Sequence, residues 1–81
     1  YVPLGEDHSI QELAIPDDWL GSSLRELDLP REHGIQVVAL YDVLRGELNV
    51  VPDPDEPLKD SDLAIVVGAD ERIGALVEEE A

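Results

Sequence analysis

The sequence predicts an α+β fold: a small sheet of about four strands with two short helices on one face, ordered strand, helix, hairpin, strand, helix. Three observations lead to this class. Two runs rich in small aliphatic and β-branched residues, 35–44 and 62–68, are typical of buried strands. Leucines at helical spacing follow a helix-start signal. An acidic, proline-rich segment, 52–61, lies between the strand-forming runs and cannot itself join a sheet.

The first part of the chain predicts one strand and one helix. The segment "HSIQELAIP" (8–16) reads as a strand that ends at Pro16. Further on, Ser23 and Glu26 have the spacing of a capping box, in which each side chain bonds the backbone N–H of the other residue. One helical face then holds three leucines, Leu20, Leu24 and Leu27.

A proline and a glycine punctuate the next stretch. Leu29 precedes Pro30 and avoids the helical region, so the helix breaks there. The segment "PREHG" makes one more turn and stops at Gly34. "IQVVALYDVL" (35–44) is then a strand buried on most of both faces, and a turn at Arg45 leads into the returning strand of a hairpin, 47–51.

The most apolar run, "DLAIVVG" (62–68), should be the central strand. Asp70 can cap a last helix, whose apolar face would carry Ile73, Leu76 and Val77. We expect a linker over 1–7, a domain over 8–78 and a frayed tail over 79–81. Since the chain begins at Tyr1 and contains no methionine, we also expect a piece of a longer protein.

Composition limits the classes of partner. Twenty acidic and five basic residues give a net charge of −15, which repels nucleic acid and anionic membranes. No run approaches the ~20 apolar residues of a membrane span. The 81-residue chain has no cysteine, so a thin core without disulfides favours a partner or a second copy. The simplest interpretation of this charge is that it keeps the protein soluble or adapts its surface to high salt, and cation binding by clustered carboxylates is the alternative.

The residues contain no arrangement that indicates an enzyme. The chain has four serines, two histidines and no threonine, and His8 beside Ser9 would point to the opposite face of a strand. Asp62 begins an apolar run but reads as a strand-end residue. The segment "DPDE" lacks the glycine and distal glutamate of a calcium-binding EF-hand loop, and Gly68 stands without the other glycines of a dinucleotide fingerprint. We therefore predict no catalytic residue and no metal site, and Trp19 is read as a core or dimer-contact residue.

Two blocks of sequence resemble a known family. "SIQELAIPDDWLGSSLRELDLPREHGIQVVAL" and "NVVPDPDEPLKDSDLAIVVGADERIGAL" are similar to the C-terminal domain of RCK proteins, also called the TrkA-C domain, from the regulatory subunits of Trk and Ktr potassium-uptake systems. The blocks cover nearly all of residues 9–77. The chain departs from the family at "LYDVLRGEL", where Tyr41 and Asp42 stand in place of a basic residue and Arg45 comes late.

The resemblance implies a regulatory, effector-binding domain that forms a homodimer and binds no cofactor of its own. Its effector would be cyclic di-AMP, which some family members bind in a cleft at the dimer interface, or a divalent cation, to which other members respond. The positions that would contact the effector are Ile35, Val37, Val38, Arg45, Asn49, Val51 and Pro52.

The resemblance also implies partners and a location. The full-length protein would sit in the cytoplasm, peripheral to the membrane, and would gate a membrane potassium-transporter subunit without inserting into the bilayer. Two alternatives remain open from the sequence. One is a purely structural dimerisation module, and the other is the same domain attached to a cation–proton antiporter.

Overall fold

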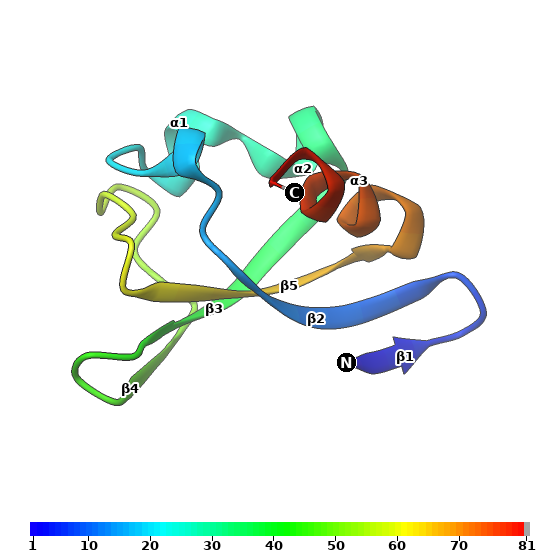
Figure 1. Ribbon diagram of the computed structural model, residues 1–81, viewed down its shortest axis with the longest axis horizontal. Coiled ribbons are helices and arrows are strands. Elements are labelled where there is room, and N and C mark those ends of the chain that lie inside the picture. Colours follow the sequence, from blue (N-terminus) through cyan, green and yellow to red (C-terminus); the bar gives the residue numbers. More distant parts are fainter. Residues whose placement is uncertain (81) are drawn as a thin grey trace.

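The computed structural model describes residues 1–80, with side chains described through residue 78. An antiparallel five-stranded sheet, in the order β1-β2-β5-β3-β4, carries all the helices on one face (Figure 1). The predicted α+β class is confirmed, and β5 is central as expected. The strands are β1 (Val2–Leu4), β2 (His8–Ala14), β3 (Ile35–Asp42), β4 (Glu47–Val50) and β5 (Asp62–Ala69). The helical segments are η1 (Asp17–Trp19), α1 (Leu24–Leu27), α2 (Leu29–His33) and α3 (Asp70–Glu80).

The two ends of the chain differ from expectation. Residues 2–4, which we placed in a linker, form the edge strand β1 and pair with β2. Three residues with a central proline carry no strand pattern, and Pro3 is tolerated because β1 is an edge. The fraying expected at 79–81 falls on Ala81 and on the side chains of residues 79 and 80, which lie outside the described residues.

The capping box at the start of α1 is confirmed. Ser23 Oγ accepts from Glu26 N at 3.2 Å, and Glu26 Oε1 accepts from Ser23 N at 3.1 Å. Asp28 takes a left-handed conformation (φ 47°) between α1 and α2, and Gly34 (φ 69°) ends α2. The predicted leucine face was wrong at Leu20, which lies outside α1 and is 39% exposed, because η1 ends before the cap.

The core lies between the sheet and the helices. Trp19 is 2% exposed, which confirms its reading as a core residue, and its ring lies 6.0 Å from that of His33. Of the three apolar residues predicted to face the sheet from α3, Ile73 and Leu76 are buried, but Val77 is 52% exposed. The core comprises Ile15, Trp19, Leu29, Ile35, Val37, Leu58, Ala64, Val66, Ile73 and Leu76.

A buried polar contact ties the first residue of α3 to β2. The fully buried Ser9 donates from Oγ to Asp70 Oδ1 at 2.5 Å, and Gln11 Nε2 donates to Ser9 Oγ at 3.0 Å. The carboxylate predicted to cap the helix therefore accepts a hydrogen bond from a strand residue. The result is a link between the β1–β2 hairpin and α3 that gives the buried Ser9 hydroxyl two half-buried hydrogen-bond partners.

The other face of the sheet carries no helix (Figure 1), and we call it the open face. Side chains alternate along each strand, and cross-strand partners share a face. Because Ala64 and Val66 are buried under the helices, Leu63, Ile65 and Val67 point away from the helices, and so do their partners on the neighbouring strands. A β-bulge between Val37 and Ala39 moves Ala39 to the open face. This face comprises Val2, Leu4, His8, Ile10, Glu12, Ala14, Gln36, Ala39, Tyr41, Leu48, Val50, Leu63, Ile65, Val67 and Ala69.

Candidate functional site

The segment 52–61, which we call the acidic loop, is fastened to the helical layer. Leu58 is 3% exposed, and its backbone N–H and C=O bond to Ser22 O at 2.9 Å and Gly21 N at 3.0 Å. Arg25 N donates to Pro54 O at 2.9 Å, and Arg25 Nε lies 2.6 Å from Asp55 Oδ1. The predicted crossing loop that stays out of the sheet is confirmed, and these contacts hold it as a wall beside the β3–β4 hairpin.

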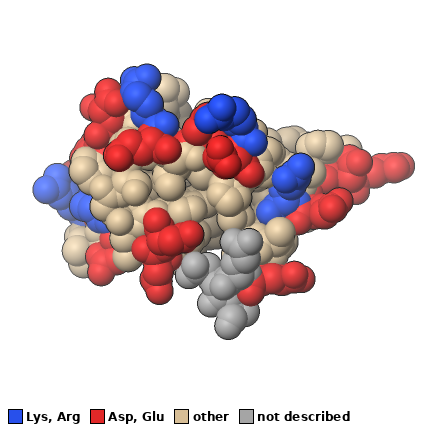
Figure 2. Space-filling model, turned by 90° about the horizontal axis from the view of Figure 1, so that it is seen from above, with Lys and Arg blue, Asp and Glu red and all other residues tan. Residues whose placement is uncertain are grey.

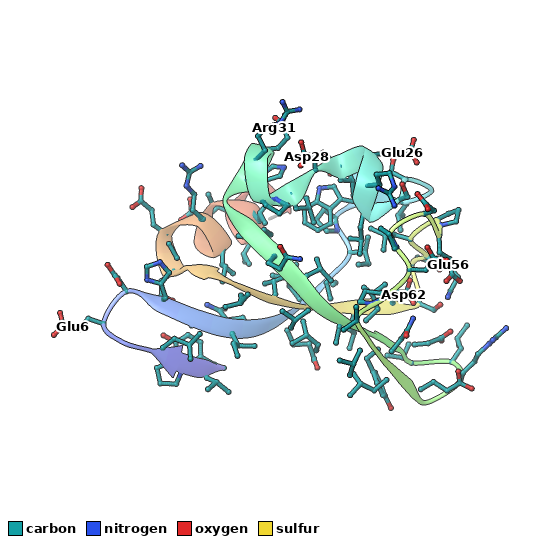
Figure 3. The ribbon with its side chains drawn as sticks, turned by 180° about the vertical axis from the view of Figure 1, so that it is seen from behind. Glu6, Glu26, Asp28, Arg31, Glu56 and Asp62 are labelled. Carbon is teal, nitrogen blue, oxygen red and sulfur yellow. The ribbon has the colours of Figure 1, made fainter. Side chains whose placement is uncertain are left out.

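A cavity of 320 Å³ lies between the hairpin and the acidic loop, and we call it the hairpin cavity. Its charged lining consists of two bases and five carboxylates, namely Arg45, Lys59, Asp42, Glu47, Asp53, Glu56 and Asp62. Figure 3 shows Glu56 and Asp62 at this end of the molecule, with Glu6 at the opposite end. Leu40, Leu48, Asn49, Pro52 and Pro57 complete the wall.

Asp42 contacts both bases of the hairpin cavity. Its Oδ2 lies 3.4 Å from Lys59 Nζ and 3.9 Å from Arg45 Nε. Partial desolvation raises the pKa of Asp42, but hydrogen bonds from the backbone of Arg45 and Leu44 and from Lys59 outweigh it and hold this pKa below its ordinary value. Attraction to Asp62, at 3.4 Å, and hydrogen bonds to both carboxylates raise the pKa of Lys59. Asp42 and Lys59 therefore stay charged at neutral pH.

A second cavity of 320 Å³, the helix cavity, adjoins the first and shares Pro52 with it. Its wall is mostly apolar, with one base from α1, and is lined by Leu24, Arg25, Leu29, Pro30, Gln36, Val37, Val51, Pro52 and Pro54. An apolar slot beside a polar, charged one suits a ligand with a flat ring and a charged or hydrogen-bonding group.

Val51, on the rim of the helix cavity, has a strained backbone. Its φ is 55°, a conformation that β-branched residues rarely adopt and that costs about 1–2 kcal/mol. Its N–H donates to Val38 O at 3.2 Å, which continues the hairpin ladder by one bond, while its side chain is 84% exposed. The kink ends β4 one residue before the predicted boundary and turns the chain into the acidic loop.

The predicted site residues divide between the two cavities. Arg45 and Asn49 line the hairpin cavity, Val37 and Val51 line the helix cavity, and Pro52 lines both. Two predicted residues lie elsewhere: Val38 is at the bulge and 37% exposed, and Ile35 is a 2% exposed core residue that can support the walls only from behind. That any of the seven contacts an effector stays a prediction.

Sequence reasoning missed several lining residues. Lys59 enters the hairpin cavity from the acidic loop, and Leu24, Leu29 and Pro30 enter the helix cavity from the helices. Lys59 is the single lysine of the chain, which is the one signal that could have singled it out. The others follow from the docking of the acidic loop on the helical layer, which no local pattern encodes.

Among the charged side chains on the helical side of the molecule, acids cover more of the surface than bases (Figure 2). Among the side chains of residues 1–78, no group of three or more histidine, aspartate or glutamate residues is arranged to hold a metal ion. In the same described part of the chain, no helix has the length and apolarity needed to cross a membrane.

The chain is thus a small α+β domain with two adjoining cavities at one hairpin. The model of the TrkA-C domain family matches residues 10–80, and the chain belongs to this family. The resemblance stated from the sequence is thereby confirmed.

Among curated relatives, the Trk system potassium uptake protein TrkA of Mycobacterium tuberculosis is 37% identical over 65 residues, 78% of this chain and 27% of the relative. The chain thus spans under a third of that relative. Among solved structures, the RCK C domain of KtrA in complex with cyclic diadenosine monophosphate has a TM-score of 0.79 and 28% identity, covering 89% of this chain and 82% of that one. The RCK_C domain dimer of Streptococcus agalactiae BusR with c-di-AMP has a TM-score of 0.69 and 25% identity, covering 93% and 91%.

Proposed function

We propose that this chain is the effector-binding and dimerisation domain of a regulatory subunit in a potassium-uptake system. The observation that supports this most is its likeness to two RCK C domains in complex with c-di-AMP, one of them described as a dimer. The family match over residues 10–80 supports a role in potassium uptake, which is the system named for its curated relatives.

The proposed effector is cyclic di-AMP, and the proposed site is the pair of cavities at the β3–β4 hairpin. Val37, Val51 and Pro52 supply an apolar wall for an adenine ring in the helix cavity. Asn49 and Arg45, in the adjoining hairpin cavity, supply an amide and a guanidinium for a phosphate or a base edge. A divalent cation is the alternative effector. Five carboxylates line the hairpin cavity, but no three acidic side chains of the described residues are arranged to hold a metal ion, so cyclic di-AMP is preferred.

Pairing of two copies would bring their open faces together. Val2 (53% exposed), Leu48 (59%) and Val50 (63%) expose apolar surface on that face, while the helices already cover the opposite one. Burying apolar surface contributes about 25 cal/mol per Å², so an isologous contact between two such faces is favourable. Glu12 is the only carboxylate among the residues of the open face, so few of the acidic side chains of the two copies would meet at this contact.

For the whole protein, we propose a non-catalytic cytoplasmic subunit that gates a membrane transporter from its inner surface. Dimer rearrangement on effector binding would pass through this domain to the rest of the subunit. A cation–proton antiporter in place of the potassium transporter is the alternative for the membrane partner. A purely structural dimerisation role is the alternative for the domain itself.

A thermal-shift screen of the 81-residue chain tests the effector. A ligand at a hundred times its Kd adds about 2.7 kcal/mol to the unfolding free energy, which raises the Tm of a domain this small by about 10 °C or more. We expect this with cyclic di-AMP. A shift with Ca²⁺ or Mg²⁺ alone would favour the cation alternative, and a dimer with no shift for any of the three would leave the structural role.

Sedimentation velocity with a matched pair of variants tests the dimer. Leu48→Asp puts a charge on the open face, whereas Leu44→Asp puts the same charge on the hairpin turn, where Leu44 is 83% exposed. We expect Leu48→Asp to dissociate the dimer and Leu44→Asp to leave it intact. A wild-type monomer at high concentration, or equal behaviour of the two variants, would contradict pairing through the open face.

A further inference from the structure

Asp42 lies between the two bases that line the hairpin cavity. The two bases lining this cavity come from different segments, Arg45 from the hairpin turn and Lys59 from the end of the acidic loop. Asp42 Oδ2 lies 3.9 Å from the first and 3.4 Å from the second. A carboxylate of the chain itself thus bridges the two cationic groups that could hold a phosphate.

The backbone fixes Asp42 in this position. Its Oδ1 accepts from Leu44 N at 3.0 Å and from Arg45 N at 3.2 Å, so the side chain is anchored in the turn. Only 14% of the Asp42 side chain is exposed, compared with 75% for Arg45 and 50% for Lys59. The carboxylate is therefore the fixed partner, and the two bases are the groups that can swing toward a ligand.

We propose that Asp42 is a built-in competitor that sets how tightly the hairpin cavity binds a phosphate-bearing effector. An incoming phosphate has to take Arg45 and Lys59 away from this carboxylate. The inference rests on the proposed function, because the anion is taken to be the phosphate of the effector. It adds a specificity-determining residue whose negative charge opposes phosphate binding, whereas the two bases favour it.

The competition is weak enough to be overcome. Exposed ion pairs contribute little because both partners are well solvated. Freeing two of them should tighten anion binding by about threefold to thirtyfold. Lys59 also has a second partner, Asp62 Oδ1 at 3.4 Å, so the loss of Asp42 leaves that base held in the cavity.

The variant Asp42→Asn isolates the charge of this side chain. Its amide oxygen can still accept from the backbone N–H groups of Leu44 and Arg45, so the turn keeps its anchor. The matched control is Glu56→Gln, which removes one charge from the lining of the same cavity. Among the described ion pairs, Glu56 holds neither Arg45 nor Lys59.

The test is an NMR titration of the wild-type chain and both variants with pyrophosphate and, separately, with cyclic di-AMP, following Arg45 Nε and Lys59 Nζ. We expect Asp42→Asn to bind pyrophosphate about threefold to thirtyfold more tightly than the wild type, and Glu56→Gln to change affinity less. Equal gains in the two variants, or no binding of pyrophosphate by Asp42→Asn, would overturn the inference.

The cyclic di-AMP arm separates this inference from the proposed function. If pyrophosphate follows the expected order while cyclic di-AMP binds to none of the three proteins, the competitor stands and the proposed effector fails. Suppose instead that cyclic di-AMP binds the wild type, but Asp42→Asn binds neither cyclic di-AMP nor pyrophosphate more tightly than the wild type does. In that case the proposed effector stands and the proposed role of Asp42 as a competitor fails.

Discussion

The helix-covered and open faces of the sheet carry similar aliphatic side chains but differ in what lies over them. On the covered face, Val66 is 0% exposed beneath α3 and its neighbours, whereas Val50 on the open face is 63% exposed. An apolar pattern in a strand therefore indicates that one face of the sheet is suited to burial, but it does not indicate which element covers that face. On the covered face that element is part of the same chain.

The largest effect is expected from a cavity in the covered face. Ile73→Ala in α3 removes a side chain that is 0% exposed in the core, and such truncations cost about 2–5 kcal/mol of unfolding free energy. Val77→Ala, one turn later and 52% exposed, is the control in the same helix and should cost under about 1 kcal/mol. Urea denaturation measures both, and equal losses would show that α3 does not seal the covered face.

The close approach of β3 to β5 on the covered face gives the next largest effect. A Cβ at Gly68 would lie 2.8 Å from Ile35 Cγ2, so Gly68→Ala should cost about 1–3 kcal/mol through overpacking. Gly74 in α3 is the control, because a Cβ there meets nothing within 4 Å. Gly74→Ala should stabilise the protein by up to about 1 kcal/mol through helix propensity.

The two glycine variants can be compared by thermal unfolding under identical conditions. A lower Tm for Gly68→Ala and a higher Tm for Gly74→Ala are expected. If Gly68→Ala were neutral, the strands of the covered face would have room to move apart, and the contrast in packing between the two faces would be smaller than the buried residues indicate.

The sequence predicted those parts of the fold that local chemistry determines. The capping box of Ser23 and Glu26, the stop at Gly34 and the central position of 62–68 depend on neighbouring residues or on one unbroken apolar run. It did not predict β1, because three residues around Pro3 become a strand only when β2 offers a partner. It also missed the bulge after Val37, which sends Ala39 to the open face although the residues alternate regularly.

The candidate site depended more on tertiary contacts. Arg45, Asn49, Val51 and Pro52 were accessible to prediction because the family resemblance concerns the hairpin, where they are close in sequence. Lys59 and Leu24 reach the same cavities only because the acidic loop bonds to Ser22 and Gly21 through Leu58. Contacts between segments more than thirty residues apart have no signature in a single sequence, and only five of the twenty lining residues were predicted.

The smallest effect on the stability of one chain, and the most informative about the open face, is expected from Val50→Ala. Because Val50 is 63% exposed, losing its methyl groups should change the unfolding free energy by less than about 0.5 kcal/mol at dilute concentration. Val66→Ala, the same change on the covered face, should cost about 2 kcal/mol, since it removes fully buried methyl groups. If a second copy covers the open face, Val50→Ala should instead weaken dimerisation by several-fold in sedimentation equilibrium. A dimer whose Kd is unchanged by this substitution would mean that the second copy pairs through another surface and that the open face serves a different partner.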